Sequence, residues 1–166
     1  MTVDVDERVR PGEAAKDYVR RLAMEKSARA LAGLKTCATT TAILAADTAV
    51  VVDGTILGKP RDDADAAAML RRLSGRPHEV VTGVSLRGSG WEVNRVEATT
   101  VQFLQLTDAD IRWYVESGEG RDKAGAYAIQ GLASRFIPGI QGSYSNVVGL
   151  PIAAVHELLA EIASRP

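Results

Sequence analysis

An aspartate interrupts the most apolar stretch of the chain. Residues 42–54 read AILAADTAVVVDG and place Asp47 beside Thr48 among alanine, isoleucine and valine. An ionised carboxylate in an apolar surround is costly unless it is paired, hydrogen-bonded or bound to a cation. The strand predicted here is therefore expected to end at Asp47 and to open into a cleft, where the carboxylate serves as metal ligand or general base. The alternative is an aspartate that caps a turn.

The rest of the chain alternates strand-like and helical patterns. Four segments carry apolar residues near helical spacing and are predicted helices: 12–34, 61–75, 107–118 and 151–163. Asp62 or Asp63 is the expected N-cap of the second. Two β-rich runs, 78–88 and 91–106, predict a hairpin around Gly-Ser-Gly. The Asp53-Gly54 pair predicts a tight turn.

This order of elements favours an α/β or α+β domain with a mixed sheet. The 166 residues fit a single domain, 1–166. Hydrophobic residues make up 46% and charged residues 25%, which is typical of a globular domain.

Charge and cysteine content narrow the expected partners and location. The net charge of −1, with both signs scattered, is not the footprint of a nucleic-acid-binding protein. No apolar run approaches a membrane span, and no secretory signal opens the chain. A single cysteine, Cys37, cannot form an internal disulfide, so a cytoplasmic location is expected.

Two loops combine glycine with charged side chains. In LGKP, residues 57–60, glycine and proline fix a loop that presents Lys59, and a lysine held in this way suits a phosphate. In GEGRDKAGAYAIQG, residues 118–131, Lys123 and Gln130 lie among four glycines, and the amide of Gln130 is suited to reading a base edge. Ordinary solvated loops are the alternative for both.

Several other chemistries lack their motifs. His78 and His156 are too isolated to suggest a zinc site, and the chain has no G-x-S-x-G nucleophile motif and no Walker A loop. Taken alone, the acidic N-terminal segment that contains Glu7, and Lys26 on the helix after it, are typical of solvated charge.

Six stretches in this order resemble the Maf family of nucleotide pyrophosphatases. They are DVDE, YVRRLAMEKSARA, AILAADTAVVVDGTILGKPRD, AAAMLRRLSGRPHEVVTGVSL, YVESGEGRDKAGAYAIQG and IQGSYSNVVGLP. The resemblance implies the α/β fold of the inosine-triphosphate pyrophosphatases, with a long mixed sheet between two lobes and a nucleotide cleft. It also implies hydrolysis of a nucleoside triphosphate to the monophosphate and pyrophosphate, with Mg²⁺ or Mn²⁺, in a homodimer.

The resemblance further implies roles for individual residues. Asp47 matches the proton acceptor, and Thr48 and Gln130 match positions linked to substrate choice. The charged cleft positions are matched by Glu7, Lys26, Lys59 and Lys123. Asp47 and Glu7 are the expected metal ligands, and Lys59 is expected to offset charge on the leaving group. AGAYAIQG is similar to the subgroup that prefers dTTP and UTP.

One part of the family pattern is not found in these 166 residues. The family begins with a β-strand and a Ser-x-Ser-Pro-Arg-Arg loop, whereas this sequence opens with MTVDVDE and contains no S-P-R-R. Without that strand, a sheet edge or apolar groove is expected to be exposed. Loss of two arginine contacts is expected to weaken phosphate binding by roughly 10² or more. The alternative function is therefore a weak or inactive relative that binds nucleotide or regulates cell division.

Overall fold

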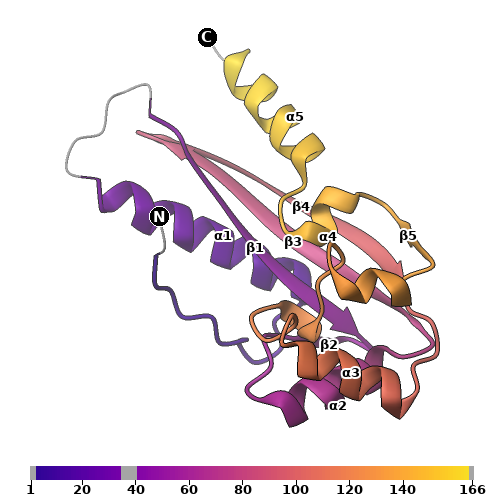
Figure 1. Cartoon of the computed structure of the whole chain (residues 1–166). Coiled ribbons are helices and arrows are strands. Elements are labelled where there is room, and N and C mark those ends of the chain that lie inside the picture. The colour runs from indigo at the N-terminus through magenta and orange to yellow at the C-terminus, as the bar shows by residue number, and fades with distance from the viewer. Residues whose placement is uncertain (1–2, 35–40, 165–166) are drawn as a thin grey trace.

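The computed structural model describes residues 3–34 and 41–164, so Cys37 lies outside the described part (Figure 1). A five-stranded sheet runs in the order β2-β1-β3-β4-β5. Its strands are β1 (Ile43–Val52), β2 (Thr55–Leu57), β3 (Pro77–Gly88), β4 (Trp91–Gln102) and β5 (Gly139–Gln141). The predicted turn at Asp53-Gly54 is confirmed, with positive φ at both residues. The predicted hairpin of β3 and β4 is confirmed as well.

Five α-helices and two short 3₁₀ segments complete the described fold. They are α1 (Ala15–Ala32), α2 (Asp63–Leu73), α3 (Asp108–Ser117), η1 (Ala124–Ala126), η2 (Leu132–Phe136), α4 (Tyr144–Val148) and α5 (Ile152–Ala163). The four predicted helices correspond to α1, α2, α3 and α5. Asp62 caps α2 through the Asp65 N–H (2.7 Å). None of the helices in the described ranges has the length and apolarity that crossing a bilayer requires.

The fold class is confirmed, but every strand pair in the described ranges is antiparallel rather than mixed. Helix α2 connects β2 to β3, and these two strands run in the same direction. They are not neighbours, however, because β1 lies between them and is antiparallel to both. Parallel pairing would require the crossover to place them side by side.

The two faces of the sheet carry different layers. On one face, Ala49 and Val81 pack against Val19 and Leu22 of α1. The opposite face carries Val50 and the rest of the main core, under α2 and α3, and α5 packs on the same face farther along β3 and β4. Figure 1 shows α1 lying along β1, with the other helices beyond the sheet. Successive residues of β1 therefore reach different layers.

Part of one edge of β1, beside the candidate active site, has no neighbouring strand among the described residues. β1 pairs with β3 from Ile43 to Val51, but with β2 only from Val50 to Val52. Within residues 3–34 and 41–164, the stretch 43–49 has no strand on its other side. The expected exposed sheet edge is therefore present. Side chains from both faces of β1 can reach a cavity along it.

Gly83 of β3 lets α1 approach the sheet closely. A Cβ at this position would lie far inside van der Waals contact of the Val19 carbonyl in α1. We expect Gly83→Ala to destabilise the protein by about 1–3 kcal/mol, since backbone has to move to relieve the overlap. Chemical denaturation would measure this loss. Gly139→Ala is the control, because a Cβ there meets open space, and an equal loss in both variants would contradict the explanation.

Candidate active site

Asp47 lies within a continuous strand, so the prediction that the strand ends there is wrong. β1 runs through Asp47, which is opposite Gly83 of β3. The strand continues because the carboxylate has a cationic partner and a cavity along the free edge. That cavity has a volume of about 290 Å³ and is lined by Asp47, Thr48, Glu7, Lys26 and residues of three later loops.

Lys26 joins the two acidic residues. From α1, its Nζ lies 2.5 Å from Asp47 Oδ1 and 2.8 Å from Glu7 Oε1. The side chains of Asp47 and Lys26 are 11% and 20% exposed, whereas that of Glu7 is 53% exposed. The carboxylate that interrupts the apolar strand is therefore paired, which offsets part of the cost of its burial.

Burial and charge act against each other in this cluster. Burial raises the pKa of Asp47 above its ordinary value, although Lys26 opposes the change. For Lys26, burial alone would lower the pKa, but the bonds to Asp47 and Glu7 outweigh it and the pKa is raised. Lys26 thus remains an ammonium ion at neutral pH, and Asp47 is a stronger base than an exposed aspartate.

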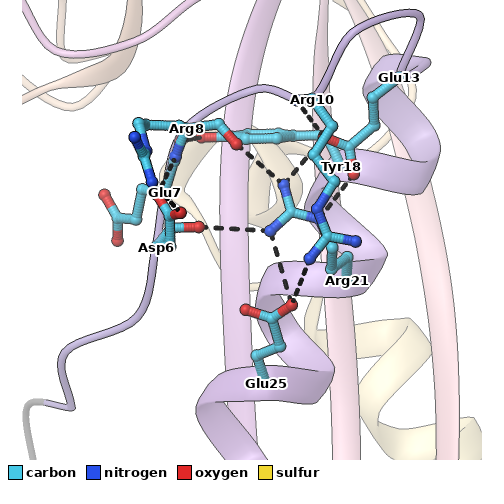
Figure 2. A network of polar contacts seen from close by, with 8 residues as sticks. All are labelled: Asp6, Glu7, Arg8, Arg10, Glu13, Tyr18, Arg21 and Glu25. Atoms are coloured by element: carbon cyan, nitrogen blue, oxygen red, sulfur yellow. Dashed lines mark hydrogen bonds and ion pairs between the residues drawn. The ribbon is translucent and has the colours of Figure 1, made fainter.

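The backbone around Glu7 is held by two side chains of α1. Tyr18 Oη donates to the Glu7 carbonyl (2.9 Å), and Arg21 donates to the carbonyls of Asp6 (3.3 Å) and Arg8 (3.1 Å). Figure 2 shows Arg21 lying between this segment and α1. Three consecutive carbonyls are thereby fixed, and the Glu7 side chain is brought toward Lys26.

Arg21 is itself anchored by Glu13. Its Nε and Nη2 lie 2.6 and 2.8 Å from the two Glu13 oxygens, a bidentate geometry drawn in Figure 2. Both side chains are largely buried, at 12% and 9% exposed. The Arg21 hydrogen bond lowers the pKa of Glu13 to about 2. The sequence shows these residues only as scattered charges, because nothing in their spacing reveals that the N-terminal segment folds back on α1.

The two predicted phosphate-binding lysines lie on neighbouring loops at the same cavity. Lys59 follows β2, Lys123 precedes η1, and both line the cavity that contains Asp47. The loops are joined because the Gly125 N–H donates to the Gly58 carbonyl (3.0 Å). Lys123 also pairs with Asp122 (2.9 Å). The structure therefore brings Lys26, Lys59 and Lys123 to one cavity.

Thr48 reaches the cavity from the other face of β1. Its hydroxyl lies 2.9 Å from that of Thr82, its partner across the sheet. Apolar side chains surround this half of the cavity: Val50, Val80, Tyr127, Val147 and Val148. Glu7, Lys26 and Asp47 reach the cavity from the α1 side of β1, whereas Val50, Val80 and Tyr127 belong to the core on the opposite face. These two sets of residues define a charged half and an apolar half of the cavity.

Asn146 fixes α4, which carries Val147 and Val148 of the apolar half. Asn146 is fully buried, and its Nδ2 donates to the Val80 carbonyl (2.9 Å) and to Thr99 Oγ1 (3.0 Å). The bonds hold α4, and Gly149 after it, against β3 and β4. The SYSN pattern is a recognisable helix cap, which Ser143 provides, but the position of Asn146 in the fold is not readable from it.

Gln130 is not at this cavity, in contrast to the predicted grouping with Asp47 and Thr48. It is exposed and lines a separate groove with Ile140 and Tyr144. The reason is a turn closed by the bond from the Gly131 N–H to the Ala128 carbonyl (3.2 Å), which places Gln130 at its tip. The predicted grouping of Gln130 with Asp47 came from the family resemblance.

The buried His78 contacts Tyr127, which lines the apolar half of the cavity. His78 Nε2 lies 2.8 Å from the hydroxyl of Tyr127, and Phe103 packs edge-on against both rings. Burial lowers the pKa of His78 to about 4, from 6.5. The ring is therefore neutral at physiological pH, and it braces Tyr127 without contributing charge.

This histidine predicts a pH-dependent stability. Between pH 6.5 and 4 the unfolded chain protonates His78 while the folded protein does not, so stability falls as the pH is lowered. The full contribution is about 3 kcal/mol, at 1.36 kcal/mol per pKa unit. Denaturant unfolding from pH 7 to 4 should therefore show a smaller loss in His78→Gln. His156→Gln, on the exposed side of α5, is the control and should follow the wild type.

The carboxylates of Asp47 and Glu7 fit a hard divalent cation. Both oxygens converge on one cationic group, Lys26 Nζ, so the site already favours positive charge. No cluster of three or more His, Cys, Asp or Glu side chains that could hold a metal is found in the described ranges. Mg²⁺ commonly takes one or two carboxylates and completes its coordination with substrate phosphates and water, which two carboxylates beside a cavity permit.

Comparison with known proteins identifies the family. A family model described as Maf-like protein matches residues 1–162. The chain belongs to the Maf family. A dTTP/UTP pyrophosphatase of Anaeromyxobacter dehalogenans (strain 2CP-C) is 55% identical over 160 residues, covering 94% of this chain and 78% of that relative. A dTTP/UTP pyrophosphatase of Shewanella oneidensis is 51% identical over 160 residues, covering 95% and 81%. The predicted family is thereby confirmed, and the Maf domain accounts for nearly all of the chain.

Proposed function

We propose that this protein hydrolyses dTTP and UTP to the nucleoside monophosphate and pyrophosphate. The observation that carries the proposal is the buried Asp47–Lys26 pair, which opens into a cavity with a charged half and an apolar half. A nucleotide has the same division into polyphosphate and base. Relatives that are 50–55% identical are named dTTP/UTP pyrophosphatases, which supports the choice of substrate.

The chain's own residues have separate roles in the proposed reaction. Asp47 accepts a proton from the water that attacks the α-phosphorus, and Lys26 keeps the carboxylate oriented. The new phosphorus–oxygen bond forms as the bond to the bridging oxygen breaks and pyrophosphate leaves. Lys59 and Lys123 offset negative charge on the leaving group.

Glu7 and Asp47 would hold Mg²⁺ or Mn²⁺, which supplies charge neutralisation on the phosphate oxygens when bound. Lys26 contacts one oxygen of Asp47, which leaves the other oxygen available. Since one oxygen cannot serve both the cation and the water at the same time, Glu7, which is the more exposed of the two, is the better candidate for the main metal ligand. The homodimer implied by the family resemblance stays a prediction.

A nucleotide panel tests the proposed function. Purified protein is incubated with dTTP, UTP, CTP, ATP and GTP in Mg²⁺ or Mn²⁺, and the monophosphate and pyrophosphate are quantified separately. We expect both products in equal amounts from dTTP and UTP. Release of orthophosphate with a diphosphate product would contradict attack at the α-phosphorus. Nucleotide binding without any turnover would instead favour the alternative of a non-catalytic Maf relative.

A further inference from the structure

Thr48 belongs to a chain of hydroxyl contacts behind the cavity wall. Its Oγ1 lies 2.9 Å from Thr82 Oγ1 and 3.5 Å from the Gly149 carbonyl oxygen. Thr82 Oγ1 lies 3.3 Å from the carbonyl oxygen of Asn146 and is fully buried. Each hydroxyl has only one proton to donate, whereas each carbonyl can only accept.

These contacts allow two fully bonded arrangements. In one, Thr48 donates to Thr82 and Thr82 donates to the Asn146 carbonyl. In the other, Thr82 donates to Thr48 and Thr48 donates to the Gly149 carbonyl. The Thr48 proton is used inside the protein in both cases. To donate to a ligand, Thr48 has to give up a contact that the fold supplies, whereas in either arrangement it keeps a lone pair that is free to accept.

The Thr48 hydroxyl oxygen, which is the acceptor in this argument, faces the apolar half of the cavity. Val80 and Tyr127 line that half, and Asp47, Lys26 and Glu7 line the other. On the proposed function, the base lies in the apolar half because the α-phosphorus has to lie next to Asp47. Uracil and thymine carry a proton on N3, whereas N3 of cytosine carries a lone pair. An acceptor that meets N3 therefore favours the first two bases.

We propose that Thr82 is a positioning residue, which keeps the Thr48 hydroxyl an acceptor and so selects uracil and thymine over cytosine. Thr82 does not line the cavity. It acts through Thr48 and through its bond to the Asn146 carbonyl, which Asn146 holds in place by its own side-chain bonds. The inference rests on the proposed function for the identity of the ligand.

The first test compares Thr82→Val with Thr82→Ser by the ratio of kcat/KM for UTP to that for CTP. Valine has nearly the same shape as threonine but offers no acceptor, so the Thr48 proton keeps only the long 3.5 Å contact to the Gly149 carbonyl and turns more readily toward cytosine N3. We expect the ratio to fall roughly tenfold in Thr82→Val, about the size of one neutral hydrogen bond, and to stay within about twofold in Thr82→Ser. An unchanged ratio in Thr82→Val, or an equal loss for both nucleotides, would overturn the proposal.

Variants of Thr48 test the same inference without a substitution at the fully buried Thr82, where valine could impair folding. Thr48→Val removes the acceptor at the cavity itself and should lower the UTP preference, and Thr48→Ser should keep it. Thr82→Val added to Thr48→Val should cause no further change in the ratio. If Thr48→Val keeps the wild-type preference, the hydroxyl does not read the base.

Binding measurements separate this inference from the proposed function. Dissociation constants for UTP and CTP are measured by calorimetry without divalent cation, alongside turnover. Hydrolysis of dTTP and UTP with an unchanged Thr82→Val ratio would leave the function and overturn the inference. Suppose instead that the protein binds UTP more tightly than CTP, that Thr82→Val removes this preference, and that no turnover is detected. That result would support the inference and overturn the proposed function. Failure to bind either nucleotide, together with no turnover in the presence of Mg²⁺ or Mn²⁺, would overturn both.

Discussion

Asp47→Asn is expected to abolish pyrophosphate release, with kcat lowered by about 10²–10⁴-fold. This is the usual contribution of a positioned general base. The amide has nearly the same shape as the carboxylate, but it accepts no proton from water and no longer balances the Lys26 ammonium group. Steady-state release of pyrophosphate from dTTP would measure the loss, and thermal unfolding would check that the fold is retained.

A matched control is available at the end of the same strand. Asp53 lies in the exposed turn after β1, where it pairs with Arg76 (2.9 Å) and has a φ of 49°. Asparagine tolerates this left-handed conformation, so Asp53→Asn should keep wild-type activity. Wild-type turnover by Asp47→Asn would remove Asp47 from the mechanism.

Arg21→Met is expected to cause the largest loss of stability, about 3 kcal/mol. The substitution leaves the Glu13 carboxylate largely buried without its bidentate partner, and it releases the carbonyls of Asp6 and Arg8. The pH dependence should change as well. In the wild type, the Arg21 contribution to stability is lost as the pH falls from about 4.5 toward 2, the folded-state pKa of Glu13, and this loss should be absent from the variant.

The adjacent arginine gives the control for stability. Arg20→Met removes only an exposed pair with Asp17, which is worth little in water. Urea unfolding should therefore place Arg20→Met near the wild type. Similar losses in both variants would mean that the ion pair of Arg21 is not the cause.

Arg21→Met should also weaken catalysis, because the backbone around Glu7 is no longer held. If Arg21 acts on catalysis through Glu7, combining it with Glu7→Gln should lower kcat/KM no further than Glu7→Gln alone. Losses that simply add would indicate that Arg21 affects the site by another route. The comparison is made well below the unfolding temperature of both variants, so that stability does not contribute.

The helices, the hairpin and the tight turn were predictable because they depend on local rules. Asp62 caps its helix through an N–H three residues away, and Asp53-Gly54 forms its turn from two residues with positive φ. The direction of strand pairing was not predictable in the same way. It depends on β1 being inserted between β2 and β3, which local patterns do not contain.

For the site, the sequence by itself determined that Asp47 needs a cationic or hydrated partner, since a bare carboxylate is too costly among valines and alanines. The glycine-containing loops pointed to Lys59 and Lys123, and resemblance to the Maf family added Lys26 and assigned all three to the cleft. Only the tertiary structure decided that Lys26 is the direct partner of Asp47 and that Arg21 holds the segment of Glu7. It also decided that Gln130 lies outside the cavity. Charge and hydropathy are properties of each residue, whereas these contacts join residues 13 or more positions apart, or depend on how a turn is oriented, and so exist only once the chain has folded.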